Sequence, residues 1–88
     1  MKVVFTKQFN KDIGKIKDRR IASLVESAIV TVKLSSKLSE INNLKKLTDY
    51  NNAYRIRIGD YRLGIFVDDE AIMFTRFLHR KEIYRYFP

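Results

Sequence analysis

The stretch from Ala53 to Phe66 reads AYRIRIGDYRLGIF and decides the fold of this 88-residue chain. Two segments of alternating apolar and polar residues flank Gly59-Asp60, a pattern that predicts a β-hairpin with a two-residue turn. Side chains alternate across a strand, so one face of this hairpin is apolar. That face carries Tyr54, Ile56, Ile58, Tyr61, Leu63 and Ile65.

The other face of the predicted hairpin gathers Arg55, Arg57 and Arg62. In the register that the turn sets, Arg57 lies opposite Arg62. Arg55 lies opposite Gly64, which leaves space beside it. Like charges that face each other across two strands destabilise a sheet. Arginines concentrated in this way indicate a binding site for a polyanion.

The charge distribution points to the same half of the chain. There are 18 basic and 10 acidic residues, which give a net charge of +8. Nine of the ten lysines precede residue 53, and six of the eight arginines follow it. Because arginine suits bidentate phosphate recognition, the second half is the predicted binding half. The simpler alternative is a well-solvated basic surface.

The length predicts one domain, residues 1–88. The chain has no cysteine, which excludes disulfides and thiolate metal sites. No apolar stretch is long enough for a signal-peptide core or a transmembrane segment. We therefore expect a cytoplasmic protein without a membrane partner.

Apolar spacing outside the hairpin predicts the remaining elements. In chain order they are a strand at 2–5, a helix around 9–16, a helix over 21–32 that Asp18 caps, a polar loop at 35–43 and, after the hairpin, a strand at 71–78. The predicted fold is α+β with two layers, in the order β-α-α-β-β-β. An N-terminal strand and a helical hairpin pack on a small antiparallel sheet, and a short helical tail ends the chain.

The strand at 71–78 is expected to bring further residues to the arginines. If Ile72 and Phe74 join the core, alternation places Phe77 and then His79 on the arginine face. Arg76 would then face the core, so it must reach the margin of the sheet, or the strand must contain a bulge. Cations interleaved with aromatic rings suit single-stranded nucleic acid, and we expect Phe77 to contact RNA bases.

The tail from Arg80 to Phe87 is expected to form one or two helical turns. Ile83 and Phe87 then dock on the sheet, whereas Arg80 and Tyr84, four residues apart, share another face.

These features resemble the RelE/ParE superfamily, the toxin half of bacterial type II toxin–antitoxin modules. The resemblance spans Val3–Phe87 and rests on the order of elements and on the segments Tyr54–Arg57, Gly59–Leu63 and His79–Tyr84. It implies a RelE-like fold and a ribonuclease that cuts messenger RNA in the ribosomal A site. It also implies an antitoxin protein as partner, for which a cationic surface favours an acidic segment. No cofactor and no metal are expected.

The resemblance also implies site residues. In RelE-like members two basic residues alternate on the strand that Arg55 and Arg57 occupy, and an arginine like Arg62 follows the turn. An arginine and a tyrosine like Arg80 and Tyr84 close the chain. RNA cleavage without metal proceeds by attack of the 2′-hydroxyl on the adjacent phosphate. We expect Arg62 and Arg80 to stabilise the developing charge, and Arg55 and Arg57 to bind flanking phosphates.

Two assignments in this site have structural alternatives. His79 is the only histidine, and histidine is the residue type best suited to a general acid or base near neutral pH. It could equally be a strand-end histidine bound to the backbone. Tyr84 could stack on a base or orient the 2′-hydroxyl, or it could pack against the sheet. The acidic trio Asp68–Glu70 lacks a histidine partner and makes a poor metal site.

Two other functions fit the same fold. ParE-like members inhibit DNA gyrase and need no ribonuclease chemistry. A plain basic module could bind RNA or the ribosome without cutting anything. His79 beside the arginines and Tyr84 favours the nuclease.

Overall fold

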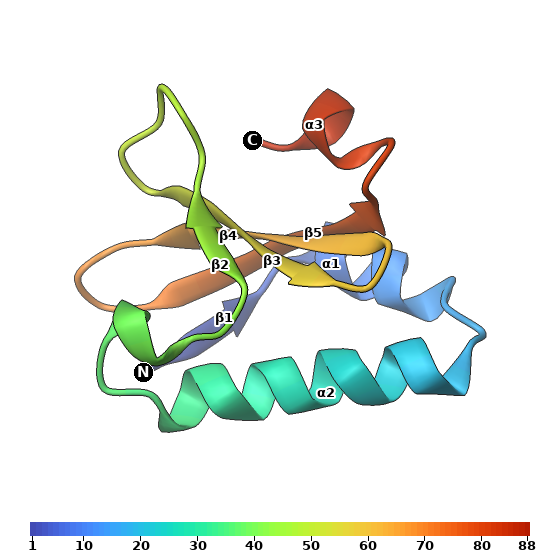
Figure 1. Ribbon diagram of the computed structural model, residues 1–88, viewed down its shortest axis with the longest axis horizontal. Helices are drawn as coiled ribbons and strands as arrows, with labels where there is room; N and C mark the ends of the chain where they lie inside the picture. Colours follow the sequence, from blue (N-terminus) through green and yellow to red (C-terminus); the bar gives the residue numbers. More distant parts are fainter.

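A mixed five-stranded sheet forms the centre of the molecule, with the strands in the order β1-β5-β4-β3-β2 (Figure 1). The computed structural model describes all residues from Met1 to Pro88. The strands are β1 (Val3–Phe5), β2 (Leu44–Lys46), β3 (Ala53–Ile58), β4 (Tyr61–Val67) and β5 (Ile72–His79). The helices are α1 (Lys7–Gly14), α2 (Arg19–Leu34), the 3₁₀ turn η1 (Leu38–Glu40) and α3 (Ile83–Tyr86). None of the helices has the length and hydropathy needed to cross a membrane.

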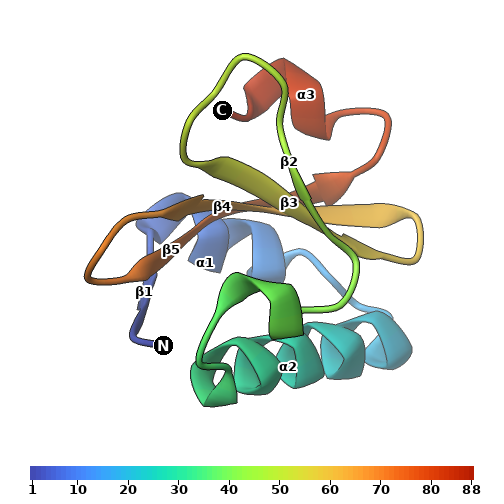
Figure 2. The same ribbon diagram turned by 60° about the vertical axis from the view of Figure 1, so that its left-hand side comes forward.

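The sheet separates two layers of helix. Figures 1 and 2 show α1 and α2 on one face of the sheet and α3 on the other. The predicted α+β class is confirmed, and its order of helices and strands is extended by β2. Two details differ from the predicted antiparallel sheet. β1 pairs in parallel with β5, and the short β2 adds an outer strand beside β3.

Local capping explains where the two long helices begin. The Thr6 side chain accepts a hydrogen bond from the Phe9 backbone N–H at 3.1 Å and so caps α1. The Asp18 carboxylate caps α2 by accepting from the N–H groups of Arg20 and Ile21, as predicted. Such caps satisfy backbone donors that the first helical turn leaves unpaired.

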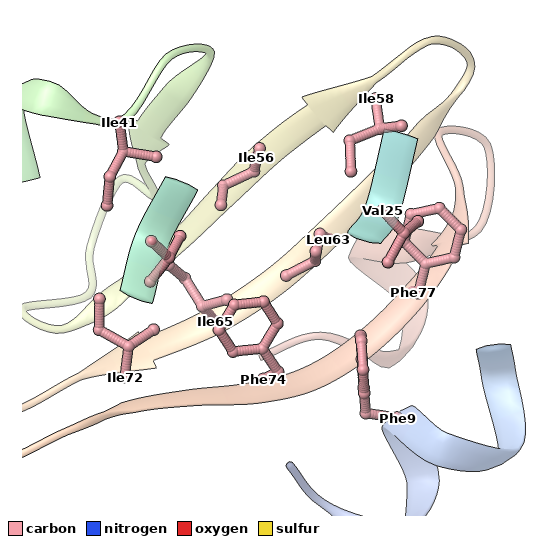
Figure 3. Close-up of a cluster of buried hydrophobic side chains, with 11 residues drawn as sticks. Phe9, Val25, Ile41, Ile56, Ile58, Leu63, Ile65, Ile72, Phe74 and Phe77 are labelled. Carbon is pink, nitrogen blue, oxygen red and sulfur yellow. The ribbon is translucent and has the colours of Figure 1, made fainter. Parts of the chain in front are cut away.

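The main core lies between the sheet and the two long helices. Figure 3 shows how apolar side chains from the sheet and from these two helices converge there, with Phe9 from α1 and Val25 from α2 meeting the strands. The strand residues in this cluster are Ile56, Ile58, Leu63, Ile65, Ile72, Phe74 and Phe77. The face of the sheet toward α1 and α2 is called the core face below, and the opposite one the arginine face.

The hairpin of β3 and β4 has the predicted register. Arg57 pairs with Arg62, and Arg55 pairs with Gly64. The turn places Gly59 at a φ of 58°, a left-handed conformation that glycine adopts without steric cost. The arginines therefore occupy one face of the hairpin, opposite the core.

A β-bulge interrupts the pairing of β4 with β5. Gly64 pairs with Arg76, but the next residue, Ile65, pairs with Phe74, so Thr75 has no partner in the register. An extra residue of this kind reverses the side-chain alternation beyond it. The bulge anticipated for Arg76 is thus present, and it turns Arg76 to the arginine face.

The same bulge makes the predicted placement of Phe77 and His79 wrong. Phe77 pairs with Leu63 in the core and is only 1% exposed (Figure 3). His79 pairs with Tyr61, whose ring stacks on Phe77 with centroids 5.1 Å apart. Both residues therefore point to the core face. Phe77 is not available to stack on RNA.

A second, smaller core joins α3 to the arginine face. Ala53, Ile83 and Phe87 are buried there, so the predicted docking of the tail is confirmed. The space beside Gly64 is filled, because the Phe87 ring lies against it. The position of α3, and of Tyr84 within it, thus depends on a residue without a side chain.

Replacing Gly64 by alanine is expected to displace Phe87 and loosen α3. An added Cβ would lie 2.7 Å from Cγ of the Phe87 ring, well inside van der Waals contact. Overpacking of this kind costs about 1–3 kcal/mol. Thermal unfolding and hydrogen exchange of the Phe87 amide, which donates to the Ile83 carbonyl at 2.8 Å, would measure both effects.

The matched control for this substitution is Gly14→Ala. A Cβ at Gly14 meets no atom within 4 Å, and alanine is the better helix former. Gly14→Ala should therefore leave stability equal or higher and leave the Phe87 amide protected. Equal behaviour of the two variants would show that Phe87 has room to move.

Candidate functional site

Three other arginines are close enough to Arg62 to lower its pKa, and the four residues are called the arginine cluster: Arg55, Arg57, Arg62 and Arg80. Arg55 and Arg57 come from β3, Arg62 comes from β4, and Arg80 follows directly after β5. Sequence reasoning predicted all four. The pairing of β3 with β4 places the first three together, and the turn after β5 adds the fourth.

Backbone carbonyls hold two of these guanidinium groups. Arg62 Nη1 donates to the carbonyl oxygens of Gly59 and Tyr61, each at 2.9 Å. Arg55 Nη1 donates to the carbonyl oxygen of Asn43 at 2.8 Å. Carbonyl oxygens orient a guanidinium group but do not neutralise it. The positive charge of both arginines therefore remains available to an anionic ligand.

Arg80 is held at the hairpin turn. Its backbone N–H donates to the Asp60 carbonyl oxygen at 2.7 Å. Its Nε lies 3.8 Å from the Asp60 carboxylate, and both side chains are more than half exposed. An exposed ion pair at this distance is weak. The hydrogen bond fixes the backbone of Arg80. Its guanidinium group can still leave the Asp60 carboxylate and bind a phosphate.

The charges of the cluster act on Arg62. Burial lowers the pKa of Arg62, and the nearby charge of Arg55 lowers it further. Arg57 and Arg80 act in the same direction, whereas Tyr84 opposes them. The charged form of Arg62 is thus less stable than in water, and an anion bound beside it would relieve the repulsion.

Tyr84 completes this group of five residues. It lies in α3, is 59% exposed, and acts electrostatically on Arg62. Of the seven site residues predicted from sequence, the structure brings these five together and leaves Phe77 and His79 on the core face. His79 Nδ1 accepts the Lys81 N–H at 3.2 Å, which is the backbone-bound alternative named above.

The sequence as a whole is similar to those of known toxins. Residues 3–84 match the family described as the ParE toxin of type II toxin–antitoxin systems. A curated relative, Toxin RelE3 of Methanocaldococcus jannaschii, is 43% identical over 89 residues, and the match covers 100% of both chains. The chain belongs to the RelE/ParE superfamily of type II toxins.

Solved structures of toxins share the fold. The RelE chain of a RelB–RelE antitoxin–toxin complex from Methanococcus jannaschii is similar with a TM-score of 0.80 and 40% identity, covering 97% of this chain and 99% of that one. An archaeal RelE–RelB complex from Pyrococcus horikoshii has a TM-score of 0.73 at 22% identity, covering 90% and 93%. The YoeB dimer from Staphylococcus aureus also reaches 0.73, at 20% identity, covering 90% and 95%. The last two show the fold alone.

In this RelE/ParE toxin a pocket of about 340 Å³ lies next to the arginine cluster. Arg55 and Tyr84 line it together with Lys45, Lys46 and Tyr50. Lys45 pairs with Arg55 across β2 and β3, so the two cations are neighbours. Sequence reasoning missed these lysines because it did not predict β2, although the basic pair in a polar segment was a visible signal.

The toxin offers no evident metal ligands. No group of three or more histidine, cysteine, aspartate or glutamate side chains is placed to hold a metal ion. The side chains gathered at the site are instead cationic or phenolic. Side chains of these types are suited to phosphate binding, charge stabilisation and base stacking.

Proposed function

We propose that this toxin is an endoribonuclease that cleaves messenger RNA in the ribosomal A site without metal, and so acts in the cytoplasm. The observation that carries the proposal is the arginine cluster with Tyr84 beside it. Two of its guanidinium groups are oriented by carbonyl oxygens and not neutralised by carboxylates. A preoriented cationic site of this kind stabilises a charged phosphate in its transition state.

Arg55, Arg57 and Tyr84 would hold the RNA strand. Single-stranded RNA binds through phosphate pairing with cations and base stacking on aromatic rings. Arg55 and Arg57 would take the phosphates on either side of the cleaved bond. The exposed ring of Tyr84 would stack on a base or orient the reacting ribose.

Arg62 and Arg80 would stabilise the reacting phosphate. The 2′-hydroxyl loses its proton and its oxygen forms a bond to phosphorus, while the bond from phosphorus to the 5′-oxygen breaks and that oxygen takes up a proton. The products are a 2′,3′-cyclic phosphate and a 5′-hydroxyl end. Negative charge on the phosphate oxygens rises in between, and two guanidinium groups oppose it.

The arginine cluster contains no good general base for the proton transfers of this reaction. Arginine stays protonated at physiological pH and makes a poor base. His79, whose imidazole could act as a general acid or base, points to the core face beside Tyr61. We therefore assign the cluster to charge stabilisation and positioning, and we expect the ribosome to complete the site by holding the messenger RNA in line for attack.

A cognate antitoxin would cover this surface. The relatives from Methanococcus jannaschii and Pyrococcus horikoshii were solved as RelB–RelE and RelE–RelB complexes. The net charge of +8 in this chain favours an acidic partner segment. Such a segment would neutralise the arginine cluster or displace α3.

The alternative is inhibition of DNA gyrase. The family that matches residues 3–84 is named after ParE, and ParE-like members poison gyrase. The departure of His79 from the arginine face removes one argument against this function. A non-catalytic RNA- or ribosome-binding module remains the third reading.

Expression of the chain without antitoxin distinguishes these functions. Messenger RNA 5′ ends and plasmid supercoiling would be measured together after induction in a bacterial host. We expect cuts within translated messages, in phase with codons. DNA breaks with altered supercoiling and intact messages would establish the gyrase inhibitor instead. Normal growth with neither effect would establish the non-catalytic module.

A further inference from the structure

Arg76 of β5 connects α1 with α3, two helices near opposite ends of the sequence. Its Nε donates to Asp12 Oδ2 of α1 at 2.8 Å, and its Nη2 donates to Asp12 Oδ1 at 3.2 Å. The carbon of its guanidinium also lies 5.4 Å from the centroid of the Tyr86 ring in α3. One side chain of β5 thus contacts a helix from each layer.

The guanidinium of Arg76 is held in a fixed orientation. Asp12 is only 3% exposed, and it accepts further hydrogen bonds from the Phe77 backbone N–H at 2.9 Å and from Gln8 Nε2 at 3.2 Å. A two-point pair with a carboxylate locks the plane of a guanidinium. The pair uses the edge of the group, so its flat face remains free for an aromatic ring.

The helix α3 needs a contact of this kind. It has four residues, and Ile83 and Phe87, one turn apart, bury the side that faces the sheet. A single row of anchors allows a short helix to roll about its axis. Tyr84 lines the pocket beside Arg55, whereas Tyr86 contacts Arg76. Tyr86 is 54% exposed, so the sheet does not enclose its ring, and its contact with the Arg76 guanidinium supplies a second anchor for α3.

We propose that Arg76 and Tyr86 are positioning residues, and that the chain of contacts from Asp12 through Arg76 to Tyr86 fixes the roll of α3 and thereby holds Tyr84 at the pocket that it lines with Arg55. The activity arm of its test rests on the proposed ribonuclease function. The structural arm does not, because the placement of Tyr84 is measurable in an inactive protein.

Tyr86→Ala tests the contact, with Tyr86→Phe as the matched control. Phenylalanine keeps the ring over the guanidinium, whereas alanine removes it. On ribosomes programmed with messenger RNA, we expect Tyr86→Ala to lower kcat about five- to tenfold with less than a twofold change in KM, as for an interaction that acts on the reacting geometry. Tyr86→Phe should retain at least half of the wild-type kcat.

Arg76→Lys is the second variant, since lysine keeps the charge facing Asp12 but offers no flat face. It should reproduce the kcat loss of Tyr86→Ala. Both variants must remain folded for this comparison, which thermal unfolding establishes. A normal kcat in a folded Tyr86→Ala protein overturns the proposal, as does an equal loss in Tyr86→Phe.

NMR of the full chain supplies the readout that is independent of activity. Nuclear Overhauser contacts between the Tyr84 ring and the residues that line its pocket, Arg55 among them, should be present in wild type and Tyr86→Phe, and lost in Tyr86→Ala. If the wild-type protein cuts no RNA, the proposed function fails while these contacts still decide the positioning. Unchanged contacts in Tyr86→Ala overturn the positioning role whatever the activity.

Discussion

Replacing Arg62 by alanine is expected to lower messenger RNA cleavage by a factor on the order of a hundred to a thousand, the usual loss when one preoriented donor is removed from a developing anion. Arg62 is the residue on which the other members of the cluster act, because Arg55, Arg57, Arg80 and Tyr84 all influence its pKa. The loss should lie in kcat. Single-turnover cleavage on programmed ribosomes would measure it.

Stability should change little in the same variant. Alanine loses the hydrogen bonds from Arg62 to the carbonyls of Gly59 and Tyr61, each worth about 1 kcal/mol net. The substitution also removes the repulsion from Arg57 directly opposite, about 0.2–1 kcal/mol. It removes as well the cost of burying the charged guanidinium, which is what lowers the pKa of Arg62. These opposing effects should leave the free energy of unfolding within about 1 kcal/mol of wild type.

Arg85→Ala is the control for the loss of one positive charge. Arg85 is exposed in α3, and it makes no side-chain hydrogen bond or ion pair. Cleavage by this variant should stay within about threefold of wild type, the scale of an exposed charge contact. An equal loss in both variants would show that total charge matters and that Arg62 has no special place. A large fall in the melting temperature of Arg62→Ala alone would make Arg62 structural.

The sequence was sufficient for the hairpin because its information is local. Gly59 permits the turn, and the alternation on either side of it leaves one register that buries the apolar face. Arg55, Arg57 and Arg62 then fall on one face by arithmetic. The tail was predictable for a similar reason, since Ile83 and Phe87 are spaced by one helical turn and both are buried.

The error at Phe77 and His79 shows where such arithmetic stops. Alternation was counted from Phe74, and one unpaired residue at Thr75 reversed everything beyond it. Arg76 indicated that the alternation breaks in this strand, because burying a cation on the core face is energetically costly. The sequence offered two remedies, a margin position or a bulge, and both are found. Arg76 follows the bulge and also reaches the edge of the sheet.

What the sequence could not supply were contacts between distant segments. Asp12 and Arg76 are 64 residues apart, and nothing in α1 marks Asp12 as different from a solvated helix residue. Asp12 can bind the backbone of β5 only because β1 ends opposite Phe74 and leaves the rest of this edge of β5 without a neighbouring strand. Farther along, the Phe77 N–H at the edge of the sheet has no strand to bind, and Asp12 accepts it.

The site therefore has two parts of different origin. The hairpin carries its own arginines, and their arrangement follows from a turn and a register. Arg80 and Tyr84 are added by the tail, whose position depends on the Asp60 carbonyl, the contact of Phe87 with Gly64, and the contact of Tyr86 with Arg76. A partner that moved the tail would dismantle the site and leave the hairpin intact.

Replacing Asp12 by alanine should give the largest loss of stability of any substitution considered. It would leave the Arg76 guanidinium, whose side chain is 18% exposed, without its counter-charge and the Phe77 N–H without an acceptor. Breaking a buried ion pair at one partner costs about 3–5 kcal/mol. In a domain of this size, that lowers the melting temperature by more than about 10 °C. Calorimetry or thermal circular dichroism would measure the shift.

The double variant Asp12→Ala/Arg76→Met separates the unpaired charge from the lost packing. It should be more stable than Asp12→Ala alone, because no cation is left without a partner. A double variant that is less stable than Asp12→Ala would contradict this account of the pair. In that case the hydrogen bond to the Phe77 N–H, and not the unpaired guanidinium, would explain the loss.

The pH dependence of the Asp12 effect has a definite sign. Burial alone would raise the pKa of Asp12, but hydrogen bonds from Arg76, Phe77 and Gln8 outweigh it and hold the pKa below its ordinary value. A carboxyl group with a depressed pKa in the folded protein stabilises it above the unfolded pKa, and that stability disappears as the pH falls through the folded pKa. The difference in unfolding free energy between wild type and Asp12→Ala should therefore be constant near neutrality and shrink below about pH 4. A difference that grew on acidification would mean that Asp12 is protonated in the folded toxin, and the ion pair with Arg76 would not exist.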